Sequence, residues 1–126
     1  MGEIMSQQLQ VLWELNIKTG KADELRSIAR DLVAFIKSGE PRTVACNVYI
    51  NEDESLISFK DTFADGDAFI FHSENFASSS FGEQILERTD GGRLCIYGNP
   101  PQTLKDILSE AGYEVEWFNL VDGYFR

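Results

Sequence analysis

The first long pattern in the chain is an alternation of apolar and polar positions from Leu9 to Lys18. Trp13 lies on the more apolar side of this run, between Val11 and Leu15. A period of two sends successive side chains to opposite faces, so the pattern predicts a β-strand. Thr19-Gly20 then interrupts the alternation and ends the predicted strand.

The segment that follows has a helical period. Between residues 25 and 36, apolar side chains recur every three or four positions and form one stripe. Asp23 and Glu24 suit the positive N-terminal end of a helix, and Lys37 suits its negative C-terminal end. Gly39 is a suitable C-terminal cap and Pro41 prevents continuation, so we expect a helix of about five turns.

Two further alternating runs, at residues 44–50 and 56–63, flank the polar sequence Asn51–Glu54. Two strands joined by so short a polar segment predict an antiparallel hairpin. Asn47 and Tyr49 share the more polar face of the first run.

The rest of the chain adds helices and two strands. Asp65 can cap a second helix, and Ser80-Phe81-Gly82-Glu83 has the spacing of a capping box that starts a short helix. Asp90-Gly91-Gly92 predicts a turn before a strand at residues 93–97. Asn99-Pro100-Pro101 then predicts the start of a third helix, and the alternation at residues 113–118 predicts a last strand.

The predicted order, β-α-β-β-α-β followed by α-β, is that of an α+β ferredoxin-like antiparallel sheet with an added C-terminal helix and strand. We expect one domain over residues 1–126, with a core at about 8–98, an extension at about 99–119 and a tail at 120–126. Trp13 and Leu12 point to opposite faces, as do Val48 and Tyr49. A sheet that is apolar on both faces needs a cover on both, which predicts a homodimer whose sheets close a dimeric α/β barrel.

The composition narrows the possible partners. The formal net charge of −10 disfavours binding to nucleic acid or to an anionic membrane surface. There is no run of ~20 apolar residues and no visible signal peptide, so we expect a cytoplasmic protein. Cys46 and Cys95 lie in apolar runs and are interpreted as small buried side chains. One histidine, scattered carboxylates and no phosphate-binding glycine loop predict neither a metal site nor a bound cofactor.

One segment resembles a known family. The run D-T-F-A-D-G-D-A-F-I-F-H, from Asp61 to His72, is similar to the hallmark of the antibiotic biosynthesis monooxygenase (quinol-monooxygenase-like) family of the dimeric α/β-barrel superfamily. Asp61 matches the first acid of that hallmark and Phe63 its aromatic residue, which is usually Trp. Asp65 matches the second acid, Ala68 the alanine and His72 the histidine.

The resemblance implies a dimer with a mostly apolar cavity. Some members of the family oxidise phenolic or quinol compounds with O₂ and use no metal or flavin. An electron-rich phenolate can react with O₂ once a pocket orients and desolvates it. A related branch degrades haem, but here Trp13 stands where that branch has Asn, and Phe63 lacks the indole N–H donor. We therefore expect no haem.

His72 is the only histidine, and histidine is the residue type that exchanges a proton near neutral pH. It is the candidate catalytic residue, as a base or as a hydrogen-bond partner of a phenol; the alternative is that it only packs its helix. The candidate ligand pocket comprises Trp13, Asn47, Tyr49, Phe63 and Phe76, although Trp13 and Phe63 could be core residues and Asn47 and Tyr49 could lie in a dimer interface. The functional alternative is a non-catalytic ligand-binding or stress-related dimer.

Overall fold

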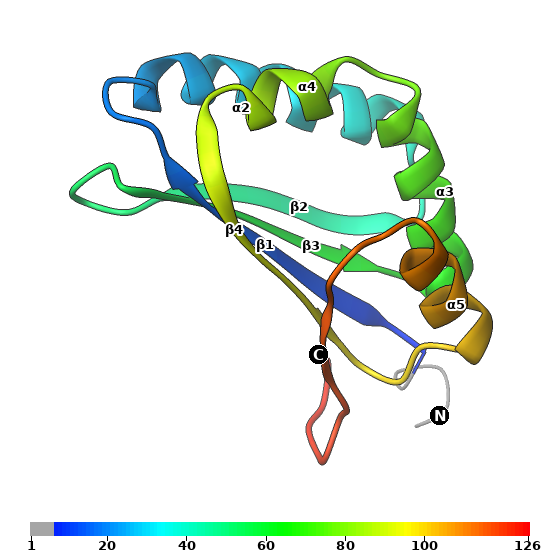
Figure 1. Ribbon diagram of the computed structural model, residues 1–126. Helices are drawn as coiled ribbons and strands as arrows, with labels where there is room; N and C mark the ends of the chain where they lie inside the picture. The colour runs from blue at the N-terminus through cyan, green and yellow to red at the C-terminus, as the bar shows by residue number, and fades with distance from the viewer. Residues whose placement is uncertain (1–6) are drawn as a thin grey trace.

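The sheet has five strands in the order β2-β3-β1-β4-β5, and its helices lie on one side of it (Figure 1). The computed structural model describes residues 7–126. Its elements in chain order are β1 (Leu9–Ile17), α2 (Ala22–Gly39), β2 (Thr43–Ile50), β3 (Leu56–Phe63), α3 (Gly66–Ala77), α4 (Phe81–Leu86), β4 (Thr89–Tyr97), α5 (Gln102–Glu110) and β5 (Glu116–Phe118).

β1 is the central strand and sets the register of the sheet. It pairs antiparallel with β3 and with β4, so that Trp13 lies between Phe59 on β3 and Leu94 on β4. β2 completes the predicted antiparallel hairpin with β3, and β5 pairs parallel with β4. The predicted α+β ferredoxin-like order with an added helix and strand is confirmed.

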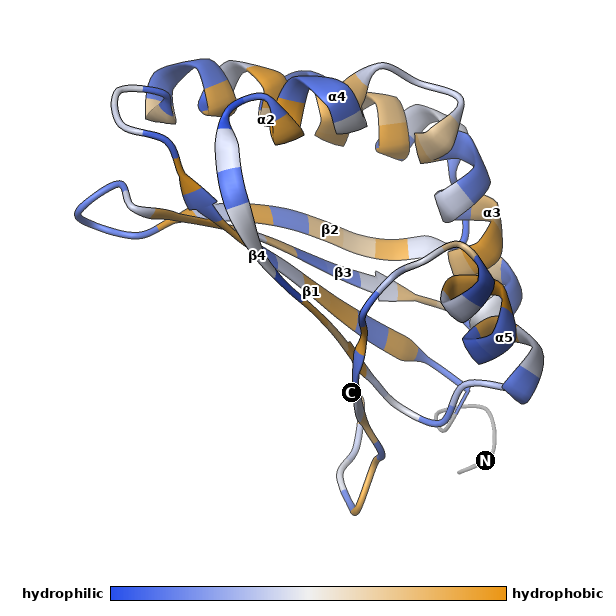
Figure 2. Ribbon diagram, in the orientation of Figure 1, coloured by the Kyte–Doolittle hydropathy of each residue, from blue (hydrophilic) through white to orange (hydrophobic). Residues whose placement is uncertain are grey.

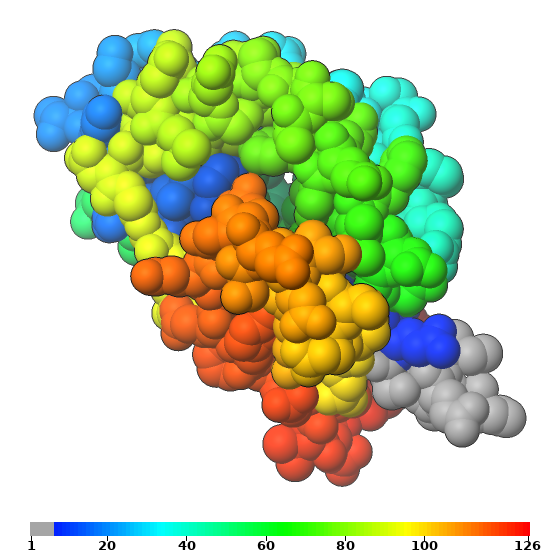
Figure 3. Space-filling view, turned by 45° about the vertical axis from the view of Figure 1, so that its right-hand side comes forward, coloured from blue at the N-terminus to red at the C-terminus, as the bar shows by residue number. Residues whose placement is uncertain are grey.

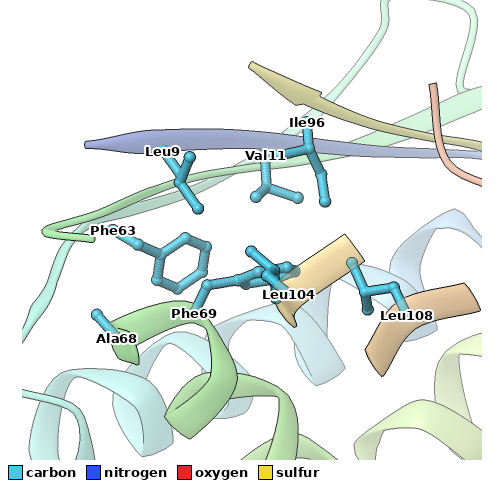
Figure 4. Packing of buried hydrophobic residues seen from close by; sticks show 8 residues of the cluster. All are labelled: Leu9, Val11, Phe63, Ala68, Phe69, Ile96, Leu104 and Leu108. Atoms are coloured by element: carbon cyan, nitrogen blue, oxygen red, sulfur yellow. The ribbon is translucent and has the colours of Figure 1, made fainter. Parts of the chain in front are cut away.

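The helices bury one face of the sheet in two apolar clusters. The first contains the stripe of α2, which packs with Leu15, Ile57 and Phe59 of the sheet and Ile85 of α4. Figure 2 shows α2 with hydrophilic and hydrophobic positions in alternating bands, as an amphipathic helix requires. The second cluster lies where α3 and α5 meet the sheet (Figure 4) and contains Leu9, Val11, Phe63, Ala68, Phe69, Ile96, Leu104 and Leu108.

The other face of the sheet is not covered by any helix within residues 7–126 (Figure 1). Leu12 points away from the helices, because it alternates with Val11 and Trp13 along β1. Lys60 and Cys95 pair with Leu12 and share its face, and so does Tyr97, two residues after Cys95 on β4. Phe118 of β5 pairs with Tyr97, and their rings stack at 4.7 Å. We call this surface the open face.

Asp90-Gly91-Gly92 does not form the predicted turn, since β4 begins at Thr89 and these residues lie within the strand. The register with β1 shifts between Leu15 and Ile17, which marks a bulge opposite the two glycines. A Cβ at Gly92 would lie only 1.8 Å from the carbonyl oxygen of Glu14, so only glycine fits there.

Of the predicted helix ends, one is confirmed and others differ from the prediction. Ser80 does not cap α4 with its side chain; its Oγ instead accepts a hydrogen bond from Gln84 Nε2. Asp65 does cap α3, accepting from the backbone N–H of Ala68 at 3.0 Å. Gly39 is the last residue of α2 and Glu40 is its cap residue, whereas α5 starts only after Pro101. The last strand is shorter than the predicted 113–118 and starts at Glu116.

Candidate active site

The side chain of His72 lies between two carboxylates. Its Nδ1 is 2.8 Å from Oε1 of Glu40, and its Nε2 is 3.9 Å from Oδ2 of Asp61. His72 comes from α3, Glu40 from the end of α2 and Asp61 from β3, so three elements that are distant in sequence meet here. An ionised carboxylate can only accept hydrogen bonds, so Nδ1–H donates to Glu40 and Nε2 faces Asp61.

Glu40 is only 3% exposed, although glutamate is seldom buried. Thr43 Oγ1 donates to its Oε1 and Asn75 Nδ2 donates to its Oε2, each at 2.7 Å. Together with His72, these groups satisfy the carboxylate and compensate for its loss of water. Asn75 and His72 are three residues apart on α3 and therefore share one face of the helix.

Asp61 lacks this compensation. Its Oδ1 is buried and has no hydrogen-bond partner within the described part of the chain. Burial raises the pKa of its carboxyl to about 6, and this shift remains although the neighbouring His72 acts to lower the pKa. An ordinary aspartate titrates near pH 4, so Asp61 exchanges its proton much closer to neutrality. Acids and bases with this property concentrate at functional sites.

Cys46 lies next to Asp61, because the two residues face each other in the register of β2 and β3. Burial, with the nearby carboxylate of Asp61, raises the pKa of the Cys46 thiol. The thiol therefore stays protonated and is a poor nucleophile. Cys46 and Cys95 are both free; Cys95 is buried, as predicted, whereas Cys46 is half-buried.

Aromatic rings connect His72 to the centre of the sheet. Phe63 is fully buried, and its ring lies 4.9 Å from the imidazole. Phe76 stacks on His72 at 6.1 Å and meets Trp13 edge-on at 6.0 Å. Phe69 lies 6.3 Å from His72. His72, Trp13, Phe63 and Phe76 thus form one cluster on the helical side of the sheet.

A cavity of about 360 Å³ opens over this side of Trp13. Trp13 and Leu15 of β1, Leu94 of β4 and Tyr113 and Val115 of the segment after α5 contribute to its walls. Figure 3 shows the surface hollowed between α3, α4 and this segment, with atoms of β1 at the bottom. Its size suits a small aromatic molecule, and its walls combine these side chains with the charged residues Arg93, Glu114 and Glu116.

Of the five predicted pocket residues, Trp13 lines this cavity, whereas Phe63 and Phe76 belong to the aromatic cluster around His72. The other two lie on β2. Asn47 and Tyr49 are exposed on β2, and the register places their side chains on the open face, away from His72. The ring of Tyr49 contacts the ammonium of Lys60 there at 5.9 Å. Neither residue lines the cavity over Trp13, although Asn47 borders a separate groove between β2 and α2. Their alternative place in a dimer interface stays a prediction.

Glu40 is the site residue that the sequence did not reveal. It directly precedes Pro41 at a helix end, where a glutamate is normally solvated, and only the tertiary structure brings it to His72. Within residues 7–126, no group of three or more His, Cys, Asp or Glu side chains is arranged to hold a metal ion. In the same residues, no helix is long and apolar enough to cross a membrane.

No known protein family and no curated protein matches the sequence of this chain. Solved structures do match its fold. MupZ from Pseudomonas fluorescens has a TM-score of 0.80 at 13% identity, and the match covers 95% of both chains, including the C-terminal extension.

Shorter proteins match about three quarters of the chain. Protein SO0527 from Shewanella oneidensis has a TM-score of 0.66 at 21% identity, covering 75% of this chain and 92% of its own. A protein of Caulobacter crescentus, named as a candidate antibiotic biosynthesis monooxygenase, has a TM-score of 0.62 at 20% identity, covering 75% of this chain and 90% of its own. The chain therefore has the fold that the resemblance of residues 61–72 predicted.

Proposed function

We propose that this protein binds a small phenolic or quinol molecule over Trp13 and oxidises it with O₂, using neither metal nor flavin. In this proposal the hydroxyl group of the molecule extends beyond the cavity walls to Asp61 and His72. The observation that carries the proposal is the carboxyl group of Asp61, which is buried, leaves Oδ1 unpartnered and has a pKa raised to about 6. An unpartnered buried acceptor leaves the carboxyl group incompletely hydrogen-bonded, and a hydroxyl group that enters the site would add a hydrogen bond at Oδ2, the oxygen that faces His72.

The spacing of Asp61 and His72 fits such a hydroxyl. Their facing atoms are 3.9 Å apart, too far for a direct hydrogen bond. One oxygen placed about 2.8 Å from each atom completes a triangle with both, at an angle near 90°. The phenol then donates its proton to Asp61, and the protonated imidazolium form of His72, held at Nδ1 by Glu40, donates its Nε2–H to the phenolic oxygen.

The chemistry needs only the substrate and O₂. Loss of the hydroxyl proton to Asp61 gives a phenolate, which is a much better electron donor than the phenol. A methylene carbon conjugated with the phenolate is oxidised to a carbonyl. One oxygen atom of O₂ enters the product and the other leaves as water with the two methylene hydrogens, so four electrons pass from substrate to O₂. The apolar walls desolvate and orient the phenolate.

The assembly we propose is a homodimer through the open face. Tyr97 and Phe118 form an aromatic pair there, and the ring of Phe118 is 40% exposed. Large exposed aromatic side chains on a sheet face indicate a covering partner. A second copy packed on the same face would bury these rings and close the barrel. The two free thiols further suit a reducing compartment, and we propose the cytoplasm.

A non-catalytic binding dimer is the second candidate. The observation that favours it is the complete set of hydrogen bonds around Glu40, in which His72 has a structural partner irrespective of any substrate. In that case aromatic ligands bind over Trp13 but are not turned over. The two candidates share the cavity and differ in the role of Asp61.

Two measurements on metal-free protein separate them. Binding of a panel of phenols and hydroquinones is followed by the fluorescence of Trp13 in a Trp117→Phe background, which leaves one tryptophan. O₂ consumption by the same mixtures is then recorded with an oxygen electrode. Binding with O₂ uptake supports the monooxygenase, and binding without uptake supports the non-catalytic dimer. If no compound changes the Trp13 signal, both candidates are wrong.

A further inference from the structure

The outer edge of β2 is exposed in a way that proteins normally avoid. β2 is eight residues long, and its sequence, T-V-A-C-N-V-Y-I, contains neither a charged residue nor proline. It is the first strand in the sheet order, so no strand within residues 7–126 pairs with its outer edge. A long, uncharged edge rich in β-branched residues aggregates unless another segment covers it. This edge therefore requires a partner.

A groove runs between this edge and α2. Its volume is about 550 Å³. Its apolar walls come from α2 and β2, and polar residues lie beside them: the apolar set is Ala29, Val33, Cys46, Val48 and Ile50, and the polar set is Arg26, Arg30 and Asn47.

The two arginines differ in their partners. Arg26 is held by Asp23 and Glu54, each at 2.7 Å. Arg30 forms no ion pair within residues 7–126, although the chain carries a net charge of −10. The groove consequently suits an extended segment with apolar side chains and an acidic one between them.

The tail that follows β5 has this pattern. In the segment N-L-V-D-G-Y-F-R, from Asn119 to Arg126, Val121 is 98% exposed and Tyr124 is 74% exposed. In an extended chain Leu120, Asp122 and Tyr124 share one face, which places one acid between two apolar side chains. The tail leaves the sheet on the side opposite the helices (Figure 1), toward the proposed partner on the open face.

We propose that residues 119–126 of a second copy lie in extended form along the edge of β2, with Asp122 at Arg30 and with Leu120 and Tyr124 in the apolar groove. The proposal rests on the homodimer of the proposed function and adds its closing contact. Backbone hydrogen bonds to β2 supply affinity, and the groove supplies the register. In a two-fold dimer both tails are exchanged, so both β2 edges are covered.

The tail of the same chain cannot make this contact. β2 and β5 are the two ends of the sheet, four strand spacings or roughly 19 Å apart. Eight extended residues reach at most about 28 Å, and crossing the sheet would leave too few of them to pair along β2. The occupant therefore comes from a second copy.

Charge reversal in two separately purified variants tests the proposed contact between Asp122 of one copy and Arg30 of the other. Arg30→Glu and Asp122→Arg each place two like charges at both contacts of a dimer, and we expect each to weaken dimerisation about tenfold. An equimolar mixture forms heterodimers with two different contacts. One contact pairs the native Arg30 with the native Asp122, and the other pairs the two substituted side chains, whose charges are again opposite. We expect the mixture to dimerise about as tightly as the wild type in sedimentation analysis.

Lys37→Glu, which reverses a charge on the same helix outside the groove, is the matched control and should leave dimerisation unchanged. Hydrogen exchange provides a second readout. Deletion of residues 119–126 should raise the exchange rate of the β2 backbone amides at least tenfold. If the protein is a dimer, but neither its dimerisation affinity nor the hydrogen exchange of β2 responds to any of these changes, the proposed tail contact is wrong and the homodimer remains supported. If the wild type is a monomer at high concentration, both are wrong.

Discussion

Nδ1 of His72 lies 2.8 Å from Oε1 of Glu40, a carboxylate that the protein has almost wholly removed from water. This contact fixes the orientation of the imidazole ring and leaves Nε2 directed at Asp61. One carboxylate thus positions the histidine, while the other, incompletely hydrogen-bonded, remains available to an incoming hydroxyl.

Removing the Glu40 carboxylate should destabilise the fold strongly. Glu40→Ala leaves His72, Thr43 and Asn75 without their common acceptor in a buried place. We expect a loss of about 3 kcal/mol in the free energy of unfolding, measured by urea denaturation. Glu74→Ala, an exposed change on α3, is the control and should shift the free energy by less than about 0.5 kcal/mol. Equal effects of the two changes would contradict the structural role of Glu40.

Asp61 should make stability fall as pH rises from about 4 to 6. Its pKa is raised from 3.8 to about 6 in the folded protein, so the folded state holds the proton more tightly than the unfolded state does. Below the pKa of the unfolded state, Asp61 is protonated in both states and does not change the free energy of unfolding. Above pH 6 it is ionised in both states and lowers the free energy of unfolding by up to about 3 kcal/mol.

Asp61→Asn removes this titration. We therefore expect the variant to match the wild type in stability near pH 3.5 and to exceed it by about 2 to 3 kcal/mol at pH 7.5, as measured by denaturation across this range. Asp31→Asn, at an exposed position of α2, should show no such divergence. A variant less stable than the wild type at pH 7.5 would show that the Asp61 carboxylate is well compensated after all.

Gly92 should not tolerate any side chain. The Cβ of Gly92→Ala would lie 1.8 Å from the Glu14 carbonyl oxygen, so β1 and β4 would have to separate at the bulge. We expect a loss of at least about 2 kcal/mol in thermal or urea unfolding. Gly123→Ala in the tail meets only ordinary contacts and should have little effect, and a similar small effect at Gly92 would contradict the close approach of the strands.

The open face should carry the dimer contact. Phe118→Glu introduces two charges into the proposed interface and should weaken dimerisation roughly 30-fold or more, equivalent to about 2 kcal/mol. Phe71→Glu places the same charge on an exposed aromatic of α3, on the helical side, and should leave dimerisation unchanged. Sedimentation equilibrium measures both, and the reverse order of effects would place the interface on the helices.

The sequence predicted those parts of the fold that have a local cause. The alternation around Trp13 and the stripe between Leu25 and Ile36 were sufficient for β1 and α2, because each period belongs to one kind of element. Gly91-Gly92 was misread as a turn, since two glycines suit a turn as well as a bulge and only the pairing with β1 distinguishes them.

The site was less accessible from sequence because it is assembled by tertiary contacts. His72 was predicted as a candidate catalytic residue, whereas Asp61 was matched only as the first acid of a family pattern and received no role. The pairing of His72 with Glu40 crosses 32 positions and has no sequence signal. Asn47 and Tyr49 were grouped with Trp13 because a single sequence does not say which face of each strand the helices cover. Once the register is known, the two sets lie on opposite faces.

The pH dependence of O₂ uptake tests the central role of Asp61 most directly. With a phenolic substrate and metal-free protein, kcat/KM of the wild type should rise with pH through an apparent pKa near 6, as Asp61 loses its proton and can act as the base. Asp61→Asn should remain folded, lose at least about 100-fold in kcat/KM and show no such rise. Uptake by Asp61→Asn with the rate and pH profile of the wild type would contradict this role.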